Sequence, residues 1–127
     1  MLDIERVYRM LKVDNSRDII NEGGDMADKI EDLTLLICPP SDASVWEQCA
    51  DILPQKNDEE LEPYLEALLK WLYDPNWPGA LVILERLAKF PDDILQPHVE
   101  KAVINALYDG KEGERWLYSL YELMKKS

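Results

Sequence analysis

Apolar residues recur along most of the chain at intervals of three and four, the spacing that places them on one face of an α-helix. The first such run is Ile4, Val7, Tyr8 and Leu11. Later runs are Ile30, Leu33 and Ile37; Leu61, Leu65, Leu68 and Leu72; Leu81, Leu84 and Ala88; Val99, Ala102, Val103 and Ala106; and Trp116, Leu120 and Leu123. No segment alternates between apolar and polar positions for long enough to predict a strand. The pattern therefore predicts an all-α protein of about seven helices.

Glycine and proline residues separate these runs and mark the expected turns. They gather at residues 21–24, 38–41, 54–57, 91–93 and 110–113. In the first of these turns, Gly23 and Gly24 are expected to break a short helix or linker over residues 16–22 from the segment that follows. Residues 2–12 are expected to form a separate helix that caps one end of the fold.

Two segments of the chain resemble each other: residues 61–74 read LEPYLEALLKWLYD and residues 95–109 read LQPHVEKAVINALYD. Each is followed by a turn, a tryptophan and apolar residues in register, so that Leu81 and Leu117 are 36 residues apart. A weaker copy lies upstream, where Trp46 follows Asp42. Repeats of this length are typical of α-helical hairpins that bury their apolar faces by stacking on one another.

We therefore expect an all-α fold made of a right-handed stack of about three helical hairpins, similar to a HEAT-type α–α superhelix, with an N-terminal capping helix. Residues 1–24 would form the capping helix and its linker, and residues 25–127 would form the repeat domain. The whole would be a single domain, since a chain of 127 residues is long enough to bury its own core.

The stretch WLYDPNWPGAL, residues 71–81, concentrates residues that favour a structural corner. A helix should end at Asp74, because the residue before a proline is disfavoured in the α conformation. Asp74 and Pro75 then suit the first two positions of a type I turn. Asn76 has a side chain that can cap a helix, and Pro78 suits the first position of the next helix. Trp77 would wedge between two helices as a large apolar anchor.

Two functional interpretations of this corner compete with the structural one. Asp74, Asn76, Gly79 and Glu85 fall at positions 1, 3, 6 and 12 of an EF-hand calcium loop, but Pro78 supplies no side-chain oxygen at position 5. No metal site is therefore predicted.

The second functional interpretation concerns tryptophan. Trp46, Trp77 and Trp116 occupy equivalent places in the three copies, so any that face outward would form a possible partner-binding edge. Tryptophans at helical register more often belong to the core.

The charge of the chain restricts its partners. Lys and Arg total 14 while Asp and Glu total 26, which gives a formal net charge of -12. Such a chain repels phosphate backbones, so a nucleic-acid partner is not expected. A basic protein partner would suit this charge, and so would a simple requirement for solubility.

The cysteines and the apolar runs bear on location. Cys38 and Cys49 form no C-x-x-C pair and no cluster with histidine, which favours free thiols in a reducing compartment. Charges at Asp3, Glu5 and Arg6 leave no apolar segment of a signal peptide, and no apolar run is long enough to span a membrane. We therefore expect a cytoplasmic protein without a membrane partner.

No motif of a known catalytic or cofactor-binding site is present. The chain has no G-x-S-x-G, no glycine-rich phosphate loop and no H-E-x-x-H, so no catalytic residue and no cofactor is predicted. Its single histidine, His98, is more typical of a surface or packed position. Carboxylates cluster before residues 61 and 95, where helix capping explains them.

The stretch LLKWLYDPNWP resembles a small bacterial family described only as a domain of unknown function, family 5071. The residues that carry the resemblance are Leu68, Leu69, Trp71, Asp74, Asn76, Trp77 and Pro78, with Pro39 and Asp42 as an upstream element. The resemblance covers roughly residues 38–124 and implies a HEAT-like all-α fold. It implies no activity, and the longer connection between Asp109 and Trp116 departs from the family pattern.

These observations favour a soluble helical-repeat protein that acts by binding another protein. One concrete form is an immunity-type protein that blocks a basic toxin. The alternatives are a small hydrolase that uses carboxylates, and a scaffold or homodimer without a small ligand. The sequence does not determine the oligomeric state.

Overall fold

The computed structural model describes residues 3–12 and 14–126, and this part of the chain contains helices and no strand. The α-helices are α1 (Ile4–Met10), α2 (Arg17–Asp28), α3 (Ala43–Ile52), α4 (Asp58–Leu61), α5 (Leu65–Trp71), α6 (Ala80–Leu87), α7 (Asp92–Tyr108) and α8 (Glu114–Lys126). Four short 3-10 helices are η1 (Leu33–Leu36), η2 (Leu53–Gln55), η3 (Glu62–Tyr64) and η4 (Gly110–Gly113). The predicted all-α class is confirmed.

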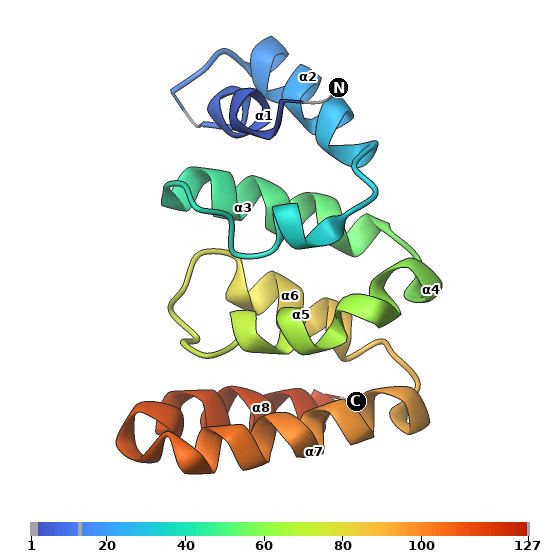
Figure 1. Cartoon of the computed structure of the whole chain (residues 1–127), viewed down its shortest axis with the longest axis vertical. Coiled ribbons are helices and arrows are strands. Elements are labelled where there is room, and N and C mark those ends of the chain that lie inside the picture. The colour runs from blue at the N-terminus through green and yellow to red at the C-terminus, as the bar shows by residue number, and fades with distance from the viewer. Residues whose placement is uncertain (1–2, 13, 127) are drawn as a thin grey trace.

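The helices lie in layers along the long axis of the molecule (Figure 1). From the N-terminal end, α1 pairs with α2, α3 lies beside η1, α5 pairs with α6, and α7 pairs with α8. Neighbouring layers touch through α2 and α3, through α3 and α6, and through α5 and α7. One hydrophobic core runs through all the layers, from Leu11 in the first to Leu123 in the last. The handedness of the stack and its kinship with HEAT repeats stay predictions.

The predicted break at Gly23 and Gly24 is wrong, because α2 runs through both glycines to Asp28. Gly23 is buried against α1, where an added Cβ would lie 2.8 Å from the Cβ of Met10. The missing side chain thus allows α1 and α2 to approach closely. Residue 24, where the sequence suggested the end of a linker, lies inside a helix that starts at the Ser16 cap.

The helix expected over Ile30, Leu33 and Ile37 is reduced to the single 3-10 turn η1. The Asp32 carboxylate caps this turn by accepting a hydrogen bond from the Thr34 N–H at 3.1 Å. The Leu35 carbonyl accepts a hydrogen bond from the Tyr8 hydroxyl at 2.6 Å, which ties the turn to α1. The apolar side chains are buried as predicted, but a short turn is enough to bury them.

The first helix of the middle hairpin is also shorter than predicted. Pro63 lies in η3, and the chain passes through α4 and η3 before α5 begins at Leu65. The Asn57 side chain caps α4 by accepting from the Glu60 N–H, and the Asn57 N–H donates in return to the Glu60 carboxylate, which is a capping box. Of the carboxylates before residue 61, Glu60 therefore takes part in helix capping, as the sequence suggested.

Candidate functional site

The four tryptophans of the chain belong to one aromatic cluster, which we define as Trp46, Trp71, Tyr73, Trp77 and Trp116. Trp46 contacts Trp71 and Trp77 edge to face, with ring centroids 5.6 and 5.7 Å apart. Tyr73 stacks on Trp77 at 5.8 Å and contacts Trp116 at 5.5 Å. These are favourable geometries for aromatic pairs. Since the rings come from α3, α5, the corner and α8, the cluster joins the three C-terminal layers.

Hydrogen bonds fix the orientation of three of the indoles. Trp46 donates to the Pro39 carbonyl at 2.7 Å, and Trp71 donates to the Pro78 carbonyl at 2.8 Å. Trp116 donates to the Leu69 carbonyl at 3.0 Å. A buried indole N–H that lacks a partner is destabilising, so these acceptors are part of what holds the rings in place.

The corner after α5 begins with a tight turn at Asp74. The Asp74 carbonyl accepts from the Trp77 N–H at 3.0 Å, and its carboxylate accepts from the Asn76 N–H at 2.9 Å. The second carboxylate oxygen pairs with Arg115 of α8 at 3.0 Å. Asp74 therefore shapes the turn and connects it to the last helix.

The second half of the corner differs from the sequence prediction. Pro78 does not begin a helix; it precedes Gly79 in a further turn, in which the Ala80 N–H donates to the Trp77 carbonyl at 3.1 Å. Gly79 has a left-handed φ of 78°, and α6 starts only at Ala80. Asn76 does not cap α6, because the capping position is Gly79 and no side chain bonds there. The proline–glycine order suits a type II turn.

The tryptophans suggested as partner contacts are only partly accessible. Trp116 is 5% exposed, while Trp46 and Trp77 are half-buried against the core. Beside Trp77, a shallow hollow of about 380 Å³ opens toward α8. It is lined by Tyr73, Asp74, Trp77, Lys111, Glu112 and Arg115. Sequence reasoning singled out neither Tyr73 nor Trp71 as a cluster member, although both lie in the stretch that it identified as the corner.

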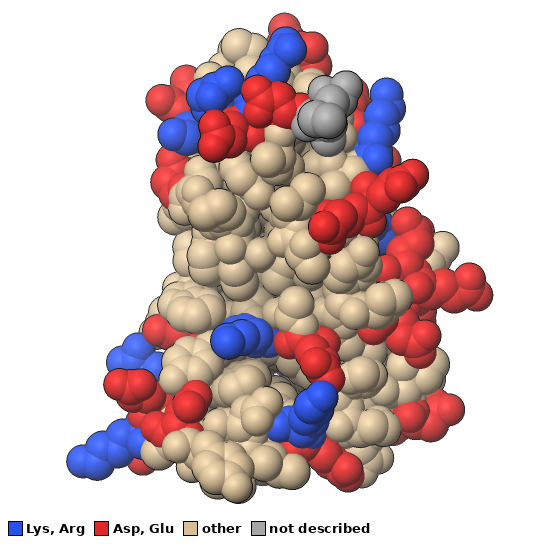
Figure 2. Space-filling view, viewed as in Figure 1, with Lys and Arg blue, Asp and Glu red and all other residues tan. Residues whose placement is uncertain are grey.

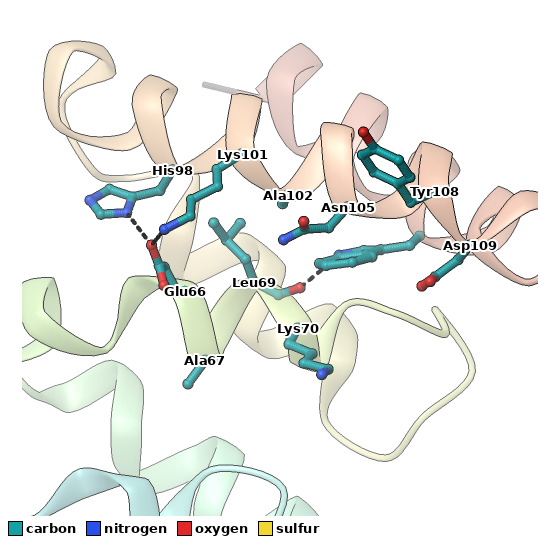
Figure 3. A pocket seen from close by; sticks show the side chains of 11 residues that line it. Glu66, Ala67, Leu69, Lys70, His98, Lys101, Ala102, Asn105, Tyr108 and Asp109 are labelled. Atoms are coloured by element: carbon teal, nitrogen blue, oxygen red, sulfur yellow. Dashed lines mark hydrogen bonds and ion pairs between the residues drawn. The ribbon is translucent and has the colours of Figure 1, made fainter.

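A larger groove of about 540 Å³ lies between α5 and α7 (Figure 3). Glu66 of α5 points across it and forms an ion pair with Lys101 of α7 at 2.8 Å, and His98 lies 3.9 Å from the same carboxylate oxygen. The hydrogen bond and the charge of Lys101 lower the pKa of Glu66. Leu69 and Trp116 contribute apolar surface to the groove. Acidic and basic groups are balanced here, so this groove does not concentrate the charge of the chain.

The negative charge is concentrated instead on one flank of the stack. Figure 1 shows the three connections between layers on the side where α4 lies, and Figure 2 shows acidic side chains gathered along this side. We define the acidic flank by the exposed carboxylates of these connections, Glu31, Asp32, Glu59, Glu60, Glu62, Asp92 and Asp93. The same connections expose two lysines, Lys29 and Lys89, so the seven carboxylates dominate.

Two further cations of this region are turned inward. Lys56 is 8% exposed, and its ammonium donates to the Asp28 carbonyl at 3.2 Å, which ties the end of α2 to the next connection. The Arg86 guanidinium donates to the carbonyls of Pro54 and Lys56 at 3.1 and 2.9 Å and pairs with Asp58 at 2.7 Å. These cations are used to hold the connections together, so they contribute little positive charge to the surface of the acidic flank.

Residues 3–12 and 14–126 contain no group of three or more His, Cys, Asp or Glu side chains arranged to hold a metal ion. A helix with the length and apolarity to cross a membrane does not occur in the same part of the chain. Hydrogen bonding to the Ser44 hydroxyl lowers the pKa of Asp42, which caps α3.

These features define a class of protein: stacked layers of helices with acidic connections, in which an aromatic cluster joins the three C-terminal layers. The chain belongs to the family described as a domain of unknown function (DUF5071), whose model matches residues 46–127. This match confirms the resemblance carried by the corner motif, and it includes the whole aromatic cluster, while α1, α2 and η1 lie outside it. Comparisons with the curated proteins and with the solved structures gave no match.

Proposed function

We propose that this protein is a binding module whose acidic flank takes a basic segment of another protein. The observation that carries the proposal is the distribution of charge: seven exposed carboxylates line connections that expose two lysines. Such a surface attracts a basic partner. The attraction extends over the Debye length, which is about 10 Å at 0.1 M ionic strength. It also raises the rate of encounter more than it raises affinity.

The construction of the flank supports the same proposal. The connections are held by bonds from Lys56 and Arg86 to backbone carbonyls, so the carboxylates project from a fixed frame. A rigid frame lowers the ordering cost on binding. Within the flank, a depression of about 420 Å³ between the end of α2 and α4 gives a basic side chain a place to enter. Its lining includes four acidic residues and two lysines: Asp28, Glu31, Glu59, Glu60, Lys29 and Lys56.

In its most concrete form, the proposal is an immunity-like role in the cytoplasm of a bacterium, in which the partner is a basic toxin. The hydrogen bonds to Asp42 and Glu66 lower the pKa of both carboxyl groups, so neither suits the general acid that the alternative, a carboxylate hydrolase, needs. A carboxylic acid that acts as general acid near neutral pH needs a pKa raised toward the working pH. Both groups are instead held ionised by their hydrogen-bond donors.

The test replaces Glu31, Glu59 and Glu62 by glutamine, which removes three charges and leaves the capping box of α4 intact. The probe is a fluorescein-labelled peptide of alternating lysine and glycine, titrated at 50 mM salt and followed by fluorescence anisotropy. At about 0.5 kcal/mol for each exposed pair, the dissociation constant should rise roughly tenfold. Binding of the wild type should weaken strongly at 500 mM salt.

The matched control removes the same charge elsewhere by changing three exposed glutamates, Glu5, Glu22 and Glu47, to glutamine. This variant should bind the peptide nearly as well as the wild type. Equal weakening in both variants would show that net charge and not the acidic flank governs binding. A wild-type affinity that does not change between 50 and 500 mM salt would also overturn the proposal.

A further inference from the structure

The two ends of the stack differ in how much apolar surface they leave open. Among the described residues, nine large hydrophobic side chains are exposed, and α7 and α8 of the last layer carry six of them. These six are Ile104, Leu107, Tyr108, Tyr118, Tyr121 and Met124, whereas the first layer exposes one of the nine, Ile19. The terminal unit of a helical stack ordinarily presents a polar outer face. The C-terminal layer thus has the composition of an interface.

The exposed side of α8 has an ordered pattern of charge and aromatic residues. At 100° per residue, Glu114, Tyr118, Tyr121 and Lys125 fall within an arc of about 60°. This arc lies opposite the buried stripe of the helix, and all four residues are exposed. Tyr118 is 59% and Tyr121 63% exposed, and the Lys125 ammonium lies 5.4 Å from the centre of the Tyr121 ring. The four side chains therefore share one surface of the helix.

The order of these four residues makes the surface of α8 complementary to a second, antiparallel copy of α8. Glu114 stands four residues before Tyr118, and Lys125 stands four residues after Tyr121. If a second α8 lies antiparallel to the first, with the twofold axis between the tyrosines, each Tyr118 meets a Tyr121. The same register places each Glu114 opposite a Lys125, so that both ends of the contact pair opposite charges. An interface that uses the same patch on both copies must have this self-complementarity.

We propose that two copies of this protein associate through antiparallel packing of α8 against α8. The four tyrosines, each about three-fifths exposed, would bury roughly 500 Å² between them. This area lies below the roughly 1,200 Å² of standard specific interfaces, so we expect a weak, readily reversible dimer. This inference does not depend on the proposed function of the acidic flank.

The two surfaces should respond to salt in opposite ways. Each copy carries a net charge of -12, so long-range repulsion between copies is strongest at low salt. The dimer should therefore strengthen when salt rises from 20 to 150 mM. Binding of a basic peptide to the acidic flank should weaken over the same interval, which makes failure of one proposal distinguishable from failure of the other.

The experiment is sedimentation velocity of the full chain between 1 and 200 µM at 150 mM salt. The wild type should show a reversible monomer–dimer equilibrium. Two single variants, Glu114→Lys and Lys125→Glu, each place like charges opposite each other and should weaken the dimer by at least tenfold. When the two variants are mixed, every charge pair across the contact is complementary again, and a heterodimer should form with nearly wild-type affinity.

Controls separate this contact from other faces. The double variant Tyr118→Gln/Tyr121→Gln should be monomeric, while Tyr108→Gln, which changes a tyrosine of α7 that is 87% exposed, should dimerise as the wild type does. Circular dichroism checks that each variant keeps its helix content. A wild type that stays monomeric at 200 µM overturns the proposal. Single charge variants that dimerise normally, or a mixture that does not recover, overturn it equally.

Discussion

Gly79 is the position where one added methyl group should most clearly damage the fold. Its φ of 78° lies in the left-handed region, which disfavours every residue with a Cβ. An added Cβ would also lie 2.4 Å from the Cβ of Ala50 on α3, and 3.3 Å from the ring of Trp71. The Cβ of Ala50 is fixed to a helix backbone and cannot rotate away. Gly79→Ala must therefore push the corner away from α3.

The expected loss of stability has two parts. A Cβ in the left-handed conformation costs about 1–2 kcal/mol. Forcing an extra carbon into a packed site costs roughly 1–3 kcal/mol more. Gly110 separates the two parts, because it also has a left-handed φ, of 61°, but an added Cβ there meets no atom within 4 Å. Gly110→Ala should lose only the conformational part, about 1–2 kcal/mol.

The assay is urea unfolding at 25 °C, followed by far-ultraviolet circular dichroism. Gly79→Ala should be less stable than Gly110→Ala by roughly 1–3 kcal/mol. Adding Ala50→Gly to the Gly79→Ala variant removes the colliding atom. The double variant should recover part of the loss, although glycine inside α3 itself costs about 1 kcal/mol. Equal losses at Gly79 and Gly110, or strictly additive effects of the two changes, would refute the close approach of corner and α3.

Three further measurements test the packing around this corner and its neighbours. Trp71→Phe removes the N–H that bonds the Pro78 carbonyl and leaves space in a fully buried site. The free energy of unfolding should therefore fall by about 2–4 kcal/mol, and a change below about 0.5 kcal/mol would contradict this role. Arg86→Lys keeps the charge, but the lysine cannot reach all three acceptors of the guanidinium. Urea unfolding should show that the free energy of unfolding falls by about 1–3 kcal/mol. Wild-type stability in this variant would mean that the three hydrogen bonds of Arg86 are unimportant. Burial raises the pKa of Cys49 from 9.0 to about 12, so above pH 9 the unfolded chain releases a proton that the native thiol keeps, and stability falls as pH rises. Cys49→Ala should therefore lose stability less steeply than the wild type between pH 8.5 and 10, and identical slopes would rule out this source of pH dependence.

Much of the fold follows from local patterns in the sequence. The three- and four-residue spacing of apolar side chains predicts the helices, because each must bury one face. The internal resemblance predicts that residues 61–74 and 95–109 both open hairpins, as α5 with α6 and α7 with α8 do. Asp74 and Pro75 predict the tight turn at the corner through the chemistry of their own side chains. In each case the information lies within a few residues of the element.

The structure differs from the sequence predictions where residues far apart in the chain determine the local conformation. Nothing near Gly23 in the sequence indicates that α1 will pack on it, and that contact makes the glycine a helix residue instead of a breaker. Gly79 likewise has a left-handed conformation against Ala50, 29 residues earlier (79 − 50), so that α6 starts two residues later than its proline suggests. The acidic flank could not be located either, because the carboxylates of three separate connections meet only once the layers stack.

Because every tryptophan lies in one cluster, tryptophan fluorescence reports on only part of this molecule. Indole emission will change when the packing between α3, α5 and α8 is lost. It will not change when only α1 and α2 unfold. Circular dichroism at 222 nm, by contrast, counts all the helices equally. If melting of the first hairpin precedes loss of the rest, the two optical curves will separate, and the gap between them will measure how independently the N-terminal end opens.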